Sequence, residues 1–220
     1  MTLGVLALAP LLPVSTIDVQ GGRHVTRELA IVTSGLDGTP VFRASAADAR
    51  ARLRVLPAVR DAAVEVELPG TARIALVERT AVGRWIGGGL EWFVDAEGVV
   101  FGSADATAAP ALRVRDERVA RGHALAGERL DPALVAAAMR LAAIAPGELR
   151  PDLARPEVVM TAGQAGLVLR SGTGWEIRFG NADRFAEKLA LAKRVLRDEP
   201  ERRLDYLDVR SPDHIVIAPP

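Results

Sequence analysis

Residues that could carry out catalysis are few in this sequence, and they lie far apart. His24, His123 and His214 fall in separate segments, and none stands at a spacing typical of metal ligands. The run Gly87–Gly89 lacks the Lys-Ser/Thr pair that follows the glycines of a phosphate-binding loop. The sequence also contains no Gly-x-Ser-x-Gly motif of a nucleophile elbow. We therefore predict a protein that is not an enzyme, with no catalytic residue, no cofactor site and no metal site.

One charged pair near the C-terminus deserves a separate interpretation. Asp208 and Arg210 stand two residues apart, so on a strand their side chains share one face. The sequence leaves two roles open for this pair, an ion pair within the fold or a pair that faces a partner. A proline turn and a final apolar run, Ile215–Ile217, follow it and predict a last strand.

Length and composition indicate a globular protein with an ample core. The 220 residues correspond to one large or two small domains, and 49% of them are hydrophobic. Lys plus Arg and Asp plus Glu both number 28, which gives a formal net charge of zero and argues against nucleic-acid binding. The sequence has no cysteine, so disulfides and cysteine-bound metals are excluded.

The N-terminus is apolar and carries no charge before Asp18. The run Leu3–Val14 is shorter than the roughly 20 residues of a membrane span and contains two prolines. It also lacks the basic flank of a signal peptide. Two interpretations remain open, a terminus that packs on the following domain or the outer end of a membrane helix.

The next stretch, from Ile17 to Arg79, predicts a strand, two helices and a hairpin. Thr26 and Ser45 are typical N-cap residues, and Leu56-Pro57 ends the second helix. The predicted elements are a strand at 17–19, helices at 27–32 and 46–55, and strands at 62–68 and 73–78.

The residues of this stretch resemble a known domain. The segments in question are Val19-Gln20-Gly21, Val25-Thr26, Leu53 with Leu56–Ala62, Leu68-Pro69 and Glu78-Arg79. In this order and at this spacing they resemble the POTRA domain of the bacterial cell-division family FtsQ/DivIB. Two positions depart from the usual pattern, since Gly22 stands where the family often has Asn and Ala81 where it often has Pro. Both lie in turns or at strand ends, so the fold expectation is unaffected.

The second half of the chain predicts short strands with glycine turns and two helices. We expect strands at 85–86, 90–94, 99–101, 157–160, 166–170 and 175–179, and helices at 133–144 and 184–197. We expect 113–127 to be irregular. Asn181 or Asp183 is the expected cap of the last helix, and Lys188 is expected in solvent.

The resemblance extends over nearly the whole chain and implies an α+β fold in three parts. Residues 1–14 would be an apolar segment that is the remnant of a membrane helix. Residues 15–81 would form the POTRA domain, with the order β-α-α-β-β. Residues 82–220 would form the family's C-terminal domain, a mixed and mostly antiparallel β domain with two helices.

The resemblance also implies a function. Members of the family are non-enzymatic scaffolds of the divisome, held in the cytoplasmic membrane by a single span, with their main domains extracytoplasmic at the division septum. They bind FtsB and FtsL and help to control septal peptidoglycan synthesis, and no nucleic acid or small-molecule substrate is implied. The alternative is a POTRA-containing transport or chaperone module of the cell envelope.

The family's FtsB contact lies on the last strand and the turn before it. By resemblance, the partner-binding residues here are Arg210, Ser211, His214, Ile215, Val216 and Ile217. If the last strand is an edge, its unpaired backbone groups can receive a partner segment as a further strand. Ser211 stands where some relatives have an aromatic residue, so a stacking contact would be missing.

Overall fold

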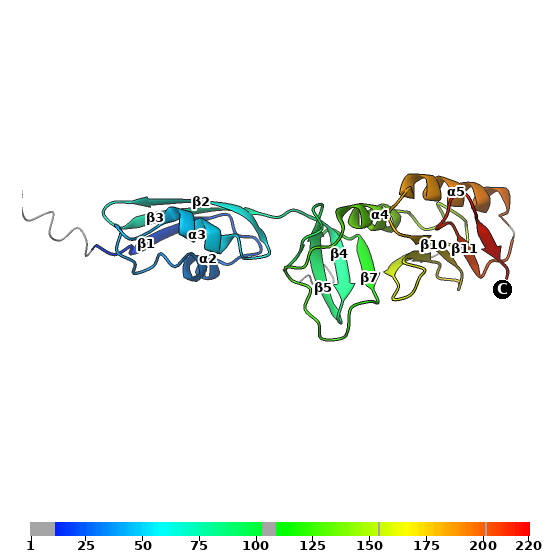
Figure 1. Ribbon diagram of the computed structural model, residues 1–220, viewed down its shortest axis with the longest axis horizontal. Helices are drawn as coiled ribbons and strands as arrows, with labels where there is room; N and C mark the ends of the chain where they lie inside the picture. Colours follow the sequence, from blue (N-terminus) through cyan, green and yellow to red (C-terminus); the bar gives the residue numbers. More distant parts are fainter. Residues whose placement is uncertain (1–11, 103–108, 154, 201) are drawn as a thin grey trace, which may run out of the picture. The chain divides into compact units, whose positions relative to one another are not determined.

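The computed structural model describes residues 12–102, 109–153, 155–200 and 202–220. The chain divides into two compact units, Met1–Thr80 and Ala81–Pro220, which are described separately below (Figure 1). Most of the predicted N-terminal apolar segment, residues 1–11, lies outside the described residues. Both units combine helices with sheet, which confirms the predicted α+β fold class.

The first unit has the predicted order of strand, two helices and two strands. Its elements are β1 (Thr16–Gln20), α2 (Arg27–Ser34), α3 (Ala46–Leu53), β2 (Val59–Glu67) and β3 (Thr71–Glu78). The strands form a three-stranded sheet in the order β1-β3-β2, in which β1 runs parallel to β3 and β2 runs antiparallel to it.

Side-chain caps fix where the two helices of this unit begin. The Thr26 hydroxyl accepts a hydrogen bond from the Leu29 N–H at 3.2 Å, and the Ser45 hydroxyl accepts one from the Asp48 N–H at 3.1 Å. These bonds satisfy N–H groups that have no partner within the helix, as the sequence predicted. Helix α3 ends at Leu53, two residues before the predicted end.

Residues 12–14 are extended and belong to the first unit. Val14 is fully buried, and its N–H donates to the Thr39 carbonyl at 2.8 Å. The Val41 N–H donates to the Leu12 carbonyl at 2.8 Å, and Pro13 forms a β-bridge with Pro40. This end of the predicted apolar segment is therefore tied to the connection between α2 and α3.

The second unit is built on one nine-stranded sheet. Its strands are β4 (Ala81–Gly87), β5 (Leu90–Asp95), β6 (Val100–Phe101), β7 (Arg113–Asp116), β8 (Glu157–Met160), β9 (Leu167–Arg170), β10 (Glu176–Gly180), β11 (Tyr206–Asp208) and β12 (Val216–Ala218). They are arranged in the order β12-β11-β10-β9-β8-β7-β4-β5-β6. The pairs β10–β11, β7–β8 and β4–β7 are parallel and the other pairs are antiparallel, which confirms a mixed, mostly antiparallel sheet.

Strand β7 corrects the prediction that residues 113–127 are irregular. Its exposed arginines alternate with two buried residues, Val114 and Asp116. Asp116 tolerates burial because its carboxylate accepts a hydrogen bond from the Trp85 indole N–H at 2.9 Å and pairs with Arg118 at 2.7 Å. A strand whose inward residues include a carboxylate does not show the usual apolar alternation.

Two helices pack against the sheet of the second unit. Helix α4 (Pro132–Ala142) begins at Asp131, whose carboxylate accepts a hydrogen bond from the Ala133 N–H at 2.9 Å. Helix α5 (Phe185–Asp198) begins differently from the prediction. Its N-cap is Arg184, with a left-handed backbone (φ 51°) and no side-chain capping bond, so neither Asn181 nor Asp183 is the cap. α4 contacts β7 and β8, and α5 contacts β10, so the core lies between helices and sheet.

Lys188 on α5 is buried, and the prediction that it lies in solvent is wrong. Only 2% of its surface is exposed. Its ammonium donates to the carbonyl of Phe179 at 3.0 Å, to the carbonyl of Asn181 at 3.1 Å and to the side-chain oxygen of Asn181 at 2.9 Å. Burial lowers the pKa of Lys188 because it disfavours the charged form. The side chain thus fastens α5 to the end of β10.

Candidate protein-binding edge

Strand β12 lies at one end of the nine-stranded sheet. It pairs antiparallel with β11, so that Asp208 faces Val216, Leu207 faces Ile217 and Tyr206 faces Ala218. No segment among the described residues pairs with its other side. β12 therefore presents a row of N–H and C=O groups at an open edge, near the C-terminus marked in Figure 1.

The opposite end of the same sheet is covered. The segment 127–130 runs beside β6, where the Val100 N–H donates to the Glu128 carbonyl at 2.9 Å and the Gly127 N–H donates to the Val100 carbonyl at 2.8 Å. The Leu130 N–H also donates to the Gly98 carbonyl at 2.8 Å. Within the described chain, β12 is thus the end of this sheet that is available for a further strand.

The six predicted partner-binding residues lie together on β12 and on the turn that leads to it. Arg210, Ser211, His214 and Val216 are exposed, whereas Ile215 and Ile217 are partly buried and pack against the core. The His214 N–H donates to the Ser211 carbonyl at 3.0 Å and closes the turn. The strand begins at Val216, so Ile215 precedes it instead of belonging to it.

Asp208 and Arg210 form an ion pair within the fold. The Arg210 guanidinium lies 2.7 Å from the Asp208 carboxylate, which also accepts the backbone N–H of Arg210 at 3.0 Å. Burial raises the pKa of Asp208, but the hydrogen bonds from Arg210 outweigh it and hold the pKa below its ordinary value. The Arg210 side chain keeps 40% of its surface exposed, so the pair holds it in a fixed, accessible position.

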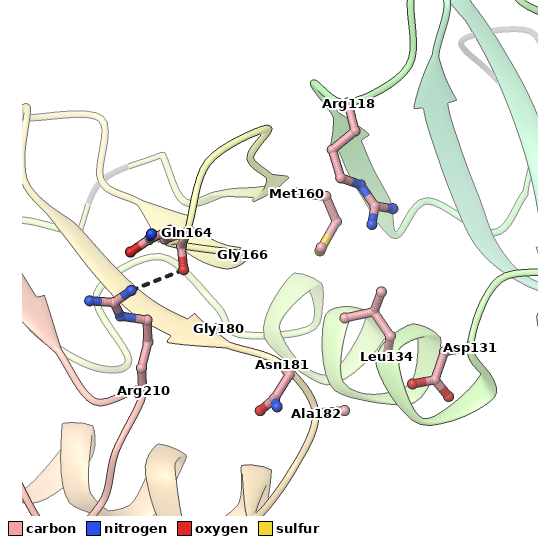
Figure 2. A pocket seen from close by; sticks show the side chains of 10 residues that line it. All are labelled: Arg118, Asp131, Leu134, Met160, Gln164, Gly166, Gly180, Asn181, Ala182 and Arg210. Atoms are coloured by element: carbon pink, nitrogen blue, oxygen red, sulfur yellow. Dashed lines mark hydrogen bonds between the residues drawn. The ribbon is translucent and has the colours of Figure 1, made fainter.

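A pocket of about 470 Å³ lies beside this pair (Figure 2). Arg210 stands on one side, where its guanidinium donates to the Gln164 carbonyl at 3.0 Å, and Arg118 stands on the other. Both arginines are paired with aspartates, and Asp131 caps α4. Because these charged groups are already paired, the pocket can offer a ligand a fitting shape and the N–H donors of its arginines. Its lining residues do not include a pair of groups placed for acid/base catalysis.

The sequence did not reveal the other residues of this pocket. Arg118, Gln164 and Asn181 stand far apart in the chain, and the topology of the sheet brings them together. None belongs to a motif, so no signal in the sequence alone could have found them.

Two further observations concern the described residues. They contain no group of three or more His, Cys, Asp or Glu side chains placed to hold a metal ion. Among their helices, none is both long enough and apolar enough to cross a membrane.

Comparison with known families gives one match in each of the two units. The profile of the "POTRA domain, FtsQ-type" matches residues 12–79, and that of "Cell division protein FtsQ/DivIB, C-terminal" matches residues 83–210. The chain belongs to the FtsQ/DivIB family. The second match ends at Arg210, so β12 and most of the turn before it lie beyond the matched part of this FtsQ/DivIB protein.

Similar proteins carry the same family name. The chain is 29% identical to the cell division protein FtsQ of Chloroflexus aurantiacus and 31% identical to that of Chloroflexus aggregans; each match covers 90% of this chain and 70% of the relative. It is 30% identical to the FtsQ of Mycobacteroides abscessus over 95% of this chain and 62% of the relative. The FtsQ/DivIB protein described here is therefore a cell-division protein of this family.

Proposed function

We propose that this FtsQ/DivIB protein is a non-enzymatic scaffold of the divisome that binds FtsB and FtsL. A membrane helix, of which the apolar residues before Leu12 would be the outer end, would anchor it in the cytoplasmic membrane as a single span, with both units extracytoplasmic at the division septum. By binding these partners it would help to control septal peptidoglycan synthesis. The open edge of β12 is the observation that carries the proposal.

The edge favours strand addition over other modes of binding. A partner strand can form backbone hydrogen bonds with the outward N–H and C=O groups of β12. Val216 has 39% of its surface exposed, whereas Ile217 packs against the core and supports the strand. Next to the strand, Arg210 and its pocket offer side-chain contacts that can select the partner. Backbone pairing would supply affinity, and the pocket would supply specificity.

The test uses proline substitutions in β12. Successive N–H groups of a strand point to opposite edges, so one of Val216 and Ile217 directs its N–H outward. Val216→Pro and Ile217→Pro are compared with Val216→Ala, which trims the side chain and keeps the N–H. The full chain is titrated with the extracytoplasmic segments of FtsB and FtsL from the same organism. We expect one proline variant to bind about tenfold more weakly, or worse, which corresponds to about 1.4 kcal/mol.

Circular dichroism checks that each variant is folded. If both folded proline variants bind as tightly as the parent chain, docking at β12 is wrong. If the parent chain binds neither segment, the assignment of FtsB and FtsL as partners is wrong, while membership of the family stands.

A further inference from the structure

Three exposed apolar residues lie on segments that meet at one end of the first unit. Leu12 has 39% of its surface exposed, Phe42 has 60% and Leu68 has 64%. They come from three different segments: the residues before β1, the connection between α2 and α3, and the turn between β2 and β3. Large apolar residues that cluster on the surface often mark a contact site.

Backbone hydrogen bonds hold these segments together. Phe42 directly follows Val41, whose N–H donates to the Leu12 carbonyl at 2.8 Å. Leu68 stands two residues before Gly70, whose carbonyl accepts the Ser15 N–H at 2.9 Å. Figure 1 shows the turn between β2 and β3 at the end of the unit where β1 begins. The three side chains therefore lie close to the point where the chain enters this unit.

The apolar sequence before Leu12 indicates which surface this end of the unit would face. Residues 3–11 are apolar or glycine and proline, without a charge. If they are embedded in a bilayer, as the proposed function holds, Leu12 emerges at the membrane surface. Phe42 and Leu68 lie on segments that are hydrogen-bonded to residues 12–15, so they would then lie near the same surface. Aromatic and apolar side chains are well suited to this interfacial region.

The charges around these residues are nearly balanced. Arg43 is exposed, and no carboxylate pairs with it among the residues that the structure describes. Asp37 is exposed nearby, and Glu67 is neutralised by Arg73 at 2.6 Å. Because the net charge here is small, contact with a bilayer would depend on the insertion of apolar side chains more than on the charge of the lipids. Arg43 directly follows Phe42, so its guanidinium could donate to lipid phosphates.

We propose that Phe42 and Leu68 form an interfacial contact with the bilayer that holds the first unit against the membrane. The partner is the lipid surface, and the inference rests on the membrane anchoring in the proposed function. Together with the attachment at Leu12, two side chains on separate segments would give three points of contact, which fix the tilt of the unit.

Exposed residues elsewhere on the unit provide matched controls. Val55 has 78% of its surface exposed and follows α3, close to Val59. Val59 pairs with Glu78 at the end of the sheet opposite the β2–β3 turn, where Glu67 pairs with Thr71. Val55 is therefore apolar and more exposed than the proposed contact residues, but it lies at the far end of the unit.

The absence of cysteine permits single-site labelling. Phe42→Cys, Leu68→Cys and Val55→Cys are each labelled with an environment-sensitive fluorophore. Each full chain is tethered through an N-terminal histidine tag to phosphatidylcholine vesicles that contain a nickel-chelating lipid. We expect the emission at positions 42 and 68 to shift to the blue and gain intensity, while the emission at position 55 stays unchanged.

Two results would overturn the proposal: no shift at either Phe42 or Leu68, or an equal shift at all three positions. Flotation of the untagged chain with the same vesicles tests the anchor separately. A chain that fails to float but shows the specific shift when tethered contradicts the proposed anchor and supports the contact. A chain that floats without the shift supports the anchor and refutes the contact.

Discussion

Replacing Lys188 by methionine should destabilise the second unit far more than the same change at a nearby lysine of α5. Lys188 is buried and donates three hydrogen bonds near the end of β10. Methionine fills a similar volume but donates nothing, so the acceptors on Phe179 and Asn181 lose a charged donor. Lys193, on the same helix, is 46% exposed and forms one surface ion pair with Glu148 at 3.1 Å, which makes Lys193→Met the matched control.

The structure sets the size of the effect. Hydrogen bonds to a charged group contribute about 1.5–3 kcal/mol each. These values already include the cost of dehydrating the donor, and burial lowers the pKa of Lys188, so the three bonds together contribute less than their simple sum. We therefore expect Lys188→Met to lower the free energy of unfolding by about 3 kcal/mol net. For Lys193→Met the expected loss is below about 1 kcal/mol, because surface ion pairs contribute little.

Tryptophan fluorescence measures this difference in one unit. Trp85, Trp92 and Trp175 all belong to the second unit, so urea unfolding followed by their emission reports on that unit alone. A loss of about 3 kcal/mol moves the urea midpoint by about 1–2 M. Equal midpoints for the two variants would show that Lys188 contributes no more than an exposed lysine, and would refute this account of its role.

Two further predictions concern carboxylates. The folded-state pKa of Asp208 is lowered, so its stabilising effect is present above its ordinary pKa of 3.8 and is lost as the pH falls through the lower, folded value. Asp208→Asn should lower the free energy of unfolding by about 1–2 kcal/mol at neutral pH. The difference in stability between this variant and the parent chain should disappear in acid. A difference that does not change with pH would contradict this prediction. Glu78 accepts the N–H groups of Arg23, His24 and Val25 at 2.7, 2.9 and 2.8 Å, so Glu78→Gln should cost the first unit about 2 kcal/mol. Amide exchange at these three residues should then accelerate, and unchanged exchange rates would refute the role of the carboxylate.

Local signals in the sequence were sufficient to predict most of the helices and strands of the first unit. Thr26 and Ser45 predicted the starts of both helices because capping depends on residues only three positions away. The β2–β3 hairpin followed from alternation and the Pro69-Gly70 turn. Each of these signals is contained within a few residues of chain.

Predictions failed where a polar residue is buried by partners distant in sequence. Asp116 in β7 depends on Trp85, and Lys188 depends on carbonyls at the end of β10. Lys188 did carry one usable signal, since it stands three residues after Phe185 and one before Leu189 and so shares their buried stripe. The order of the nine strands and the pocket beside Arg210 arise from long-range pairing that no local pattern encodes.

The covered edge at β6 has a consequence for assembly. A sheet with two open ends could join copies end to end into an open chain of sheets, whereas here segment 127–130 occupies one end. If two copies met through β12, both available edges would be used up and growth would stop at a closed pair. The same edge would accept one partner strand per chain, so self-pairing and partner binding through β12 would exclude one another.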